Sequence, residues 1–495
     1  MPSDVSGQLP RIIPSVARLC LAEGQCDACP PSVSMASAGL TLPTTDTYSV
    51  PPTLNTVRLD NHHWVAYAPV VSVGPAVLNN AALALLRRFR RPRSPDAIVS
   101  AQSAMGREES VADAVSQMQR ERLLVPHPCP APSLVESPRT LIGWLHVTRA
   151  CNLRCAYCYL DAAPEDMSPE TGELAIHAIF RSAVKHGFSG IKLKYAGGEP
   201  TLAFPLVLRL HRRAARLAEE HALELDGVVI SNGVNVTQDI LDTMQAVGLR
   251  LAVSLDGLGA YHDCQRRLAD GEGSSQATLQ SIDRALSVGL TPDISVTVTA
   301  RSLSGLPELI EWLLAHDLPF GLDFYRENNT SASRQDLRLD EQRLIVTMQT
   351  VFQVIESNLP RRSLLASLVD RTNLAWPHTR ACSVGTSYMV IDTRGRIAKC
   401  QMDIDHTVTD VTADDPLTDV QASKTGIQNL PVDEKESCRE CEWRYWCAGG
   451  CPLEAHRATG RWNTRSPYCS MYRALFPEVL RLEGLRMLKV EENVS

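Results

Sequence analysis

The chain has 495 residues, a formal net charge of −7 and 15 cysteines. This length exceeds that of one ordinary domain and predicts two to four domains with buried cores. The acidic balance and the dispersed lysines and arginines argue against a nucleic-acid partner. We find no apolar run of about 18 residues and no basic segment followed by an apolar core, so neither a membrane span nor a secretory signal is predicted. Cysteines in odd number at metal-ligand spacings predict a reducing, cytoplasmic environment.

Residues 1–50 are rich in Pro, Ser and Thr and lack sustained periodicity, so we expect a mostly disordered tail. Cys20, Cys26 and Cys29 lie close together in this tail and would suit a further metal site. The tail offers too little apolar material to fix the geometry of such a site, and unpaired thiols are the other interpretation. We assign these three cysteines no role.

Residues 51–130 are predicted to form a small separate domain. Strand-like stretches at Thr56–Leu59 and Trp64–Pro69 precede an apolar-periodic helix, LNNAALALLRRF, and a second helix spans Val111–Leu124. This order resembles the PqqD-like winged-helix module that binds precursor peptides. The resemblance implies that a leader peptide adds as a strand to the exposed edge of the small sheet. A generic winged helix that only packs on the rest of the chain is the alternative.

Residues 138–330 alternate short apolar runs with longer helical stretches. This repeated βα pattern predicts an α/β fold with parallel strands joined by right-handed crossovers. The predicted units fit a partial (β/α)6 barrel, in which chemistry gathers at the C-terminal ends of the strands. The predicted strands are Leu141–Val147, Ile191–Tyr195, Gly227–Ile230, Arg250–Ser254, Asp293–Thr299 and Phe320–Phe324.

The stretch CNLRCAYCYL follows the first predicted strand and holds Cys151, Cys155 and Cys158. Three cysteines at fixed offsets arise by chance roughly 0.01 times in a chain of this composition. The spacing C-x3-C-x2-C can place thiolates on three irons of a [4Fe-4S] cluster, and no fourth cysteine follows nearby. One iron is then open to a small molecule. A structural zinc site that lacks a ligand and a set of three buried thiols are the alternatives.

Together with Tyr157, these cysteines match the signature loop of radical S-adenosylmethionine (SAM) enzymes, which the chain strongly resembles. The resemblance implies that the open iron binds the amino and carboxylate groups of SAM. Reductive cleavage of SAM then releases methionine and a 5′-deoxyadenosyl radical, which abstracts hydrogen from a substrate. A partial (β/α)6 barrel is typical of this family. The expected partners include a reductant such as flavodoxin or ferredoxin.

A glycine pair and an acid end the second predicted strand, in YAGGEPTL. Gly197 and Gly198 allow the backbone to approach a ligand closely, and Glu199 can accept hydrogen bonds from an ammonium group. This stretch matches the GGEP element of the family, and the resemblance implies that it contacts the amino group of SAM. A simple βα turn is the alternative.

Further candidate SAM contacts follow from the same resemblance. Ser231 and Asn232 end the third predicted strand, and Ser254 and Asp256 end the fourth, where the family contacts the ribose and methionyl parts of SAM. An arginine after the His-Asp pair in YHDCQRRL pairs with the SAM carboxylate in the family, and Arg266 fits that offset. Its neighbour Arg267 is the alternative. We expect Cys264 to be a core thiol.

Residues 331–380 are interpreted as a polar connector with a helix at Leu339–Leu359, and residues 381–495 hold a second cysteine field. The field reads C-x12-G-x4-C, through Gly395, and then C-x2-C-x5-C-x3-C-x17-C, over Cys382, Cys400, Cys438, Cys441, Cys447, Cys451 and Cys469. It resembles the SPASM extension, which implies two auxiliary [4Fe-4S] clusters and three clusters in total. Two zinc sites are the alternative.

The resemblance also assigns these cysteines to individual clusters. One auxiliary cluster takes four thiolates, and the other takes three with no obvious fourth ligand. The first set is Cys438, Cys441, Cys447 and Cys469, and the second is Cys382, Cys400 and Cys451.

The order of peptide-binding module, radical core and two-cluster tail resembles maturases of ribosomally made peptides. It implies that the substrate is a precursor peptide with a leader. We expect oxidation of this peptide to form an intrapeptide crosslink, either a thioether or a C–C or C–O bond.

Two other functions remain open. Anaerobic sulfatase-maturing enzymes, which oxidise Ser or Cys to formylglycine, share the core; they carry an Asp base directly after the cysteine that matches Cys400. This chain has Gln401 there, and the nearby Asp403 is the candidate for a catalytic base. A non-catalytic iron-sulfur carrier is the third interpretation, although the cysteine loop and Glu199 are both intact.

Overall fold

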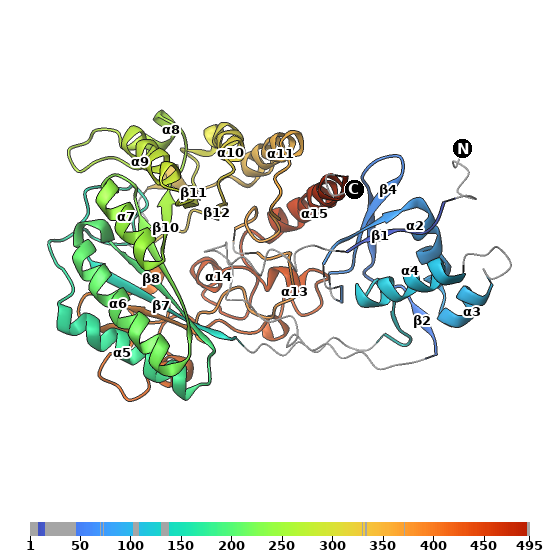
Figure 1. Cartoon of the computed structure of the whole chain (residues 1–495), viewed down its shortest axis with the longest axis horizontal. Helices are drawn as coiled ribbons and strands as arrows, with labels where there is room; N and C mark the ends of the chain where they lie inside the picture. Colours follow the sequence, from blue (N-terminus) through green and yellow to red (C-terminus); the bar gives the residue numbers. More distant parts are fainter. Residues whose placement is uncertain are drawn as a thin grey trace.

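The computed structural model describes residues 8–14, 46–69, 71–72, 74–101, 108–129, 138–328, 330–331, 334–370 and 372–492. Cys20, Cys26 and Cys29 lie outside these ranges. Figure 1 shows a module from the first quarter of the chain on one side, a large parallel sheet on the other, and C-terminal segments between the two. Within the described ranges, the helices all lack the combination of length and apolar character that a membrane crossing requires.

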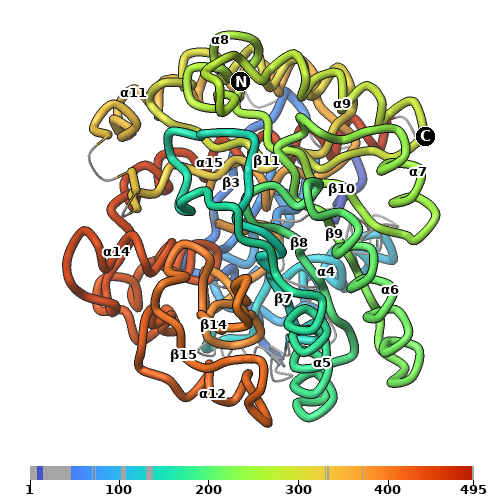
Figure 2. The backbone as a smooth tube through the Cα atoms, turned by 90° about the vertical axis from the view of Figure 1, so that its left-hand side faces the viewer, coloured from blue at the N-terminus to red at the C-terminus, as the bar shows by residue number. Residues whose placement is uncertain are grey.

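The core of the molecule is a sheet with six parallel strands in the order β12-β11-β10-β9-β8-β7. Helices connect successive strands, and α5 and α6 lie along the outer side of β7, β8 and β9 (Figure 2). These elements are β7 Thr140–Thr148, α5 Pro169–Lys185, β8 Gly190–Gly197, α6 Phe204–His221, β9 Glu224–Ser231, α7 Gln238–Val247, β10 Leu249–Ser254, α8 Ala260–Asp263, α9 Ser275–Ser287, β11 Asp293–Val298, α10 Leu306–Ala315 and β12 Phe320–Phe324. The predicted α/β fold with six parallel strands is confirmed.

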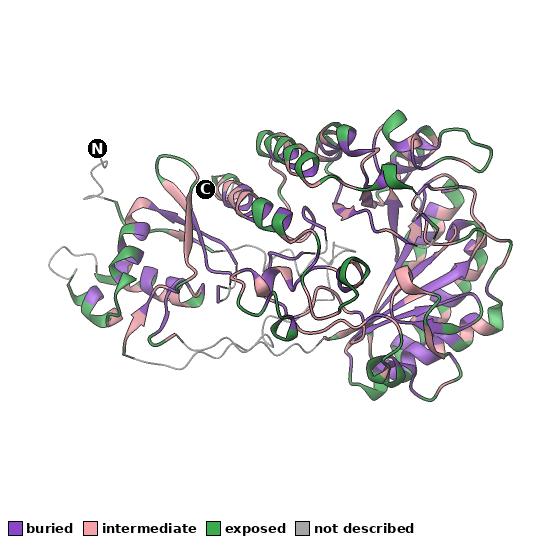
Figure 3. Cartoon of the chain, turned by 180° about the vertical axis from the view of Figure 1, so that it is seen from behind, coloured by how far each residue is buried: buried purple, intermediate pink, exposed green. Residues whose placement is uncertain are grey.

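The parallel strands form the buried interior of the lobe that lies at one side of the molecule (Figure 3). β8 is buried along nearly its whole length, because helices cover one face of the sheet and the C-terminal segments approach the other. Short apolar runs made β7, β9 and β10 stand out in the sequence, whereas β11 and β12 alternate between buried and half-buried residues. The C-terminal ends of the parallel strands meet at one edge of the barrel.

The C-terminal part of the chain extends this sheet, which the sequence analysis did not anticipate. β13 pairs in parallel with β7, with Tyr388 opposite Ile142 and Ile391 opposite Leu145, and β14 and β15 continue in antiparallel fashion. The remaining elements are α11 Glu341–Ser357, β13 Tyr388–Ile391, β14 Arg396–Ala398, β15 Thr407–Asp410, α12 Pro416–Ala422, α13 Arg444–Cys447, α14 Pro452–Thr459 and α15 Cys469–Glu492.

The interpretation of residues 331–380 as a polar connector is wrong in part. The helix is present as α11, close to its predicted bounds. Beyond it, Leu368, Leu374 and Trp376 are buried in the same apolar core as the barrel strands. These residues are irregularly spaced and show no period, so their burial could not be predicted from a local pattern.

The N-terminal module contains a four-stranded sheet in the order β1-β5-β4-β3, with helices packed against it. Its elements are β1 Ile12–Ile13, β2 Tyr48–Ser49, β3 Asn55–Arg58, β4 His63–Tyr67, β5 Ala76–Asn79, α2 Asn80–Arg87, α3 Pro95–Ser100, α4 Glu108–Arg120 and β6 Val125–Pro126. The predicted first helix begins later than expected: Leu78 and Asn79 belong to β5, and the Asn79 side chain caps α2 by accepting from Ala82 N at 2.8 Å.

The prediction of a disordered tail is wrong for residues 8–14 and 46–50. β1 pairs with β5, and β2 pairs with β6, so both stretches belong to the module. Strands of two residues are too short to produce a period in the sequence. The module also contacts α15, where Gly484 lies so close to Leu59 and Val65 that a Cβ would come within 3.0 Å of each.

Candidate functional site

The predicted cluster loop directly follows β7 and lies against the segment after α8. Backbone N–H groups of Arg154 and Ala156 donate to the carbonyls of Arg267 and Gln265, both at 2.8 Å. Burial raises the pKa of Cys155 to about 12, and Arg266 opposes this shift. A thiol of this kind becomes a ligand when a metal displaces its proton, so the loop suits metal-bound cysteines.

The spacing between the thiols bears on the choice between a zinc ion and an iron-sulfur cluster. In the part of the chain that the structure describes, no three His, Cys, Asp or Glu side chains converge as a single metal ion requires. A tetrahedral zinc ion holds its thiolates about 4 Å apart. Each cysteine of a [4Fe-4S] cluster binds a different iron, so the thiolates lie farther apart.

The glycine pair at the end of β8 touches the strand that leads into the cysteine loop. A Cβ on Gly198 would lie 2.1 Å from the carbonyl oxygen of Ala150, and one on Gly197 would lie 2.2 Å from that of Thr148. Gly197 also has a φ of 142°, which favours glycine. This close approach lets Glu199 N donate to Ala150 O at 2.8 Å.

Glu199 lies at the centre of a buried hydrogen-bond network. Its Oε1 accepts from Thr201 N, Thr201 Oγ1 and Ser231 Oγ at 2.7–3.0 Å, and its Oε2 accepts from Asn232 N at 2.7 Å. Burial raises the pKa of Glu199, and these hydrogen bonds oppose the shift. Among the described residues Oε2 accepts this one hydrogen bond, so it retains a lone pair that fits an ammonium group.

Asn232 connects this network to the cysteine loop. Its Nδ2 donates to Asn152 Oδ1 at 2.7 Å and lies 3.8 Å from Cys151 Sγ. The structure therefore brings Glu199, Ser231 and Asn232 together beside the first cysteine of the loop.

Arg266, Tyr157 and Asp256 form a second buried network on the other side of the loop. Tyr157 Oη donates to Asp256 Oδ2 at 2.6 Å and accepts from Arg266, whose guanidinium lies 3.9 Å from the same carboxylate. The Nε of Arg266 is buried and has no hydrogen-bond partner within the described ranges. An unsatisfied guanidinium beside the cysteine loop fits a ligand carboxylate.

The structure separates Arg266 from the alternative, Arg267. Arg267 is exposed and donates to the carbonyls of Asp263 and Gly271, away from the network just described. Ser254 ends β10 and is half-buried. Cys264 is half-buried as well, and its Sγ lies 3.2 Å from Tyr261 O, so it is not a fully buried core thiol.

Four cysteines of the second field surround one small cavity beneath α15. These are the four assigned to one auxiliary cluster, namely Cys438, Cys441, Cys447 and Cys469. Burial raises the pKa of Cys447 to about 12 and that of Cys438 to about 11. The other three, Cys382, Cys400 and Cys451, pack on a separate apolar cluster that includes Ile142 of β7.

A cavity of about 450 Å³ lies where the end of the cysteine loop meets the C-terminal segment. Its lining includes Tyr159, which follows Cys158, and Gln401, which follows Cys400. This volume is in the range of ligand pockets. The cavity therefore lies between the first cysteine loop and the second cysteine field.

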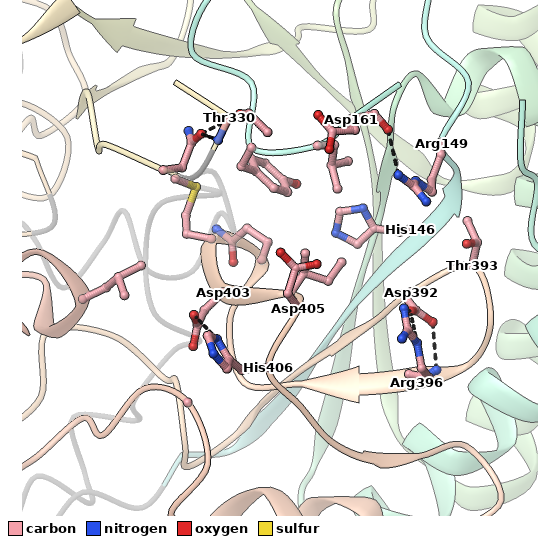
Figure 4. Close-up of a pocket in the computed structure, with 18 of the residues that line it drawn as sticks. His146, Arg149, Asp161, Thr330, Asp392, Thr393, Arg396, Asp403, Asp405 and His406 are labelled. Carbon is pink, nitrogen blue, oxygen red and sulfur yellow. Dashed lines mark hydrogen bonds and ion pairs between the residues drawn. The ribbon is translucent and has the colours of Figure 1, made fainter. Parts of the chain in front are cut away.

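His146 of β7 lines this cavity and was missed by the sequence analysis. Figure 4 shows its ring among Arg149, Asp161 and Asp405. The ring is 1% exposed, and neither nitrogen has a hydrogen-bond partner among the described residues. Burial lowers the pKa of His146 to about 3, so the ring is neutral and offers one donor and one acceptor to a bound molecule. Its position near the end of the first predicted strand was the available signal.

The candidate base Asp403 also lines the cavity, where it pairs with His406 at 2.8 Å (Figure 4). Gln401 accepts from Tyr388 Oη at 2.9 Å. A carboxylate is thus present near Cys400, two residues beyond the position expected in sulfatase maturases.

Comparisons with known proteins agree with this geometry. Residues 145–313 match the Radical SAM superfamily. Pre-heme d1 synthase of Dinoroseobacter shibae is 30% identical over 187 residues, which are 37% of this chain and 43% of that protein. The Serine-type anaerobic sulfatase-maturating enzyme of Klebsiella aerogenes is 24% identical over 356 residues, which are 67% of this chain and 83% of that enzyme.

The solved structure of anSMEcpe with bound AdoMet and Cp18Cys peptide has a TM-score of 0.55 and 17% identity, and covers 72% of this chain and 100% of its own. This likeness concerns the fold. The matches to the first three curated relatives span 43–60% of their length. Residues 145–313, with the cysteine loop and the parallel strands around it, are a radical SAM domain.

Proposed function

We propose that the chain is a radical SAM enzyme that oxidises a ribosomally made precursor peptide and forms an intrapeptide crosslink. The observation that carries this proposal is the convergence of the cysteine loop with two buried polar networks at the ends of parallel strands. When bound, a [4Fe-4S] cluster and SAM supply a 5′-deoxyadenosyl radical that abstracts hydrogen from the peptide.

The two networks divide the recognition of SAM between them. Cys151, Cys155 and Cys158 would hold the cluster. The free lone pair of Glu199 Oε2 would receive the ammonium group of SAM, and the unsatisfied Nε of Arg266 would donate to its carboxylate. Opposite charges at the two ends of the site would orient the amino acid part of SAM in one direction.

The cavity beside the loop is the proposed site for the reacting peptide side chain. A neutral His146 would hydrogen-bond a polar group of the peptide rather than take its proton, because burial disfavours the charged ring. Asp403, which lines the same cavity and pairs with His406, is the proposed proton acceptor. His146 belongs to β7 and Asp403 to the segment after Cys400, so the two residues would contact the peptide from segments far apart in the sequence.

We further propose that the second cysteine field holds two auxiliary [4Fe-4S] clusters and that a flavodoxin or ferredoxin supplies electrons. The proposal of one of these auxiliary clusters is supported by a single cavity, which is lined by Cys438, Cys441, Cys447 and Cys469. We propose a PqqD-like peptide-recognition role for residues 51–130, a radical SAM barrel over 138–330 and a SPASM region over 381–495. The assembly would work in the cytoplasm.

The test is 5′-deoxyadenosine formation by anaerobically reconstituted, dithionite-reduced protein supplied with SAM. The parent chain should form it, and Cys155→Ala should not. The matched control is Cys264→Ala, a half-buried thiol outside the loop, which should retain activity. No 5′-deoxyadenosine from the parent chain would favour the carrier interpretation, and equal amounts from Cys155→Ala would exclude the assigned cluster site.

A formylglycine-forming maturase is the second candidate, favoured by the similarity to the Klebsiella enzyme over 83% of its length. Crosslinking and oxidation of Ser to formylglycine both remove about 2 Da, but formylglycine alone carries an aldehyde. A short open reading frame beside the gene can be co-expressed, and its product weighed and treated with a hydroxylamine probe. A peptide that is 2 Da lighter and unreactive supports the crosslink, whereas a tagged peptide supports formylglycine.

A further inference from the structure

The outer edge of β5 is paired with a segment from the beginning of the chain. β1 runs antiparallel to β5, with Ile12 opposite Leu78 and Ile13 opposite Val77. β1 has two residues, and residues 15–45 separate it in sequence from the next described stretch. The sheet edge beneath it is one that any extended chain can pair with.

Asn79, the last residue of β5, contacts only backbone atoms of this segment. Its Oδ1 accepts from Arg11 N at 3.1 Å, its Nδ2 donates to Leu9 O at 2.8 Å, and its own N–H donates to Arg11 O at 3.1 Å. Backbone groups are the same in every peptide. This clamp therefore fixes an extended conformation without selecting a sequence.

The preference of this sheet edge for a particular peptide sequence comes from contacts with three neighbouring side chains of the segment. Ile12 packs on the apolar core shared by the sheet and its helices, and Ile13, 8% exposed, packs against Val77 and Met487 of α15. The Arg11 guanidinium pairs with Glu491 at the end of α15. The edge thus suits a basic residue followed by two apolar residues.

The segment is weakly attached compared with the rest of the module. Hydrogen bonds of this kind each contribute about 1 kcal/mol net, the Arg11 side chain is 62% exposed, and Ile12 is only partly buried. Leu78, Leu86 and Met118 are buried in the core of the module, against which Ile12 packs as a partly buried residue. The opposite edge, β3, reads NTVR and presents mostly polar residues.

We propose that residues 9–13 are an exchangeable occupant of a peptide-docking edge, where the chain's own segment competes with a peptide substrate of the same form. This proposal rests on the proposed function in identifying the incoming chain as a substrate. The incoming segment is extended and carries a basic residue followed by two apolar residues. β1 has to leave before such a peptide can pair with β5.

The test uses a fluorescein-labelled synthetic peptide with the sequence of residues 8–14, QLPRIIP, and follows its anisotropy. A chain that lacks residues 1–14 should bind the peptide. The full chain should bind it at least about tenfold more weakly, because a tethered segment competes at an effective concentration in the millimolar range. The control peptide QLPRDDP should bind neither chain.

Two further variants keep the test decisive. Full-length Ile12→Asp/Ile13→Asp should bind QLPRIIP like the shortened chain, since its own segment no longer fits the edge. In the shortened chain, Asn79→Asp should weaken binding, because a carboxylate still caps α2 but cannot donate to the carbonyl of the peptide.

Equal binding to full and shortened chains would place the peptide elsewhere, and absence of binding to every chain with a freed edge would overturn the proposal. If both the shortened chain and the double variant fail to fold, β1 is a structural element and the proposal is wrong. These measurements need no SAM. A chain that binds QLPRIIP but forms no 5′-deoxyadenosine would refute the proposed function alone, and the reverse result would refute the docking edge alone.

Discussion

The phenol of Tyr157 donates a 2.6 Å hydrogen bond to Asp256, and so joins the cysteine loop to the segment after β10. The same oxygen accepts from Arg266. Asp256 is held in turn by Gln265 Nε2 at 2.8 Å and Thr297 N at 2.9 Å. The Tyr157 hydroxyl therefore links the cysteine loop, two strand ends and Arg266, which is proposed to donate a hydrogen bond to the SAM carboxylate.

Tyr157→Phe should raise the Kd for SAM about tenfold, the equivalent of 1.4 kcal/mol, because Arg266 loses the acceptor that positions it. Iron content should not change, since the phenyl ring keeps its packing. Equilibrium binding of SAM and the KM for SAM are the measurements. The control is Tyr325→Phe, in the same apolar cluster but hydrogen-bonded to Ser331; an equal effect there would contradict the positioning role.

Gly198→Ala should reduce iron incorporation into the first site severely. The added Cβ would meet the backbone of Ala150, next to Cys151, and the backbone cannot move aside without displacing the loop. Iron content and absorbance of the reconstituted protein report this loss. Gly190→Ala, at the start of β8 with its closest atoms at 3.4 Å, should retain iron, and loss of iron there would show that the effect is not specific to Gly198.

Lys435→Met should shift the reduction potentials of the auxiliary clusters to more negative values by about 60 mV, the equivalent of 1.4 kcal/mol for one electron. The Lys435 side chain is fully buried, donates to Ala448 O at 2.7 Å and interacts electrostatically with cysteines of both auxiliary sets. A cation there favours the reduced, more negative clusters. Redox titration followed by electron paramagnetic resonance measures the shift, and the exposed Lys424→Met should leave the potentials unchanged.

His146→Leu should flatten the dependence of stability on pH between about 6.5 and 3. Burial holds the pKa of His146 at about 3, whereas an unfolded histidine titrates near 6.5, so in this window the unfolded chain binds more protons and stability falls as the pH falls. At pH 5 this group accounts for about 2 kcal/mol relative to pH 8. Urea unfolding of the apo-protein at both pH values tests it; an unchanged difference in the variant would show that the ring is charged or solvated.

Most of the barrel was predictable because short runs rich in apolar and β-branched residues alternate with longer helical stretches. The cysteine loop and Glu199 could also be located from the sequence, because the cysteine spacing and the GGEP stretch are local patterns. The choice between Arg266 and Arg267 could not be made from the sequence. These two adjacent arginines differ only in the direction that the backbone gives to each side chain.

The features that were missed depend on contacts between distant segments. β13 pairs with β7 from about 245 residues away, and Ile12–Ile13 pair with β5 across more than 60. His146 has an ordinary place in an apolar strand, and only the approach of the C-terminal segment turns its surroundings into a cavity. Contacts between such distant segments cannot be predicted from a local sequence pattern.

The direct pairing of β13 with β7 has a mechanical consequence. Cys151 follows one of these strands, and Cys382 and Cys400 lie on either side of the other, so a single hydrogen-bonded lattice carries both proposed redox positions. If both positions hold clusters, the paired strands would fix the distance between them, and this distance would set the rate of electron tunnelling. An opening that admits a bulky reactant would then have to take place outside these paired strands.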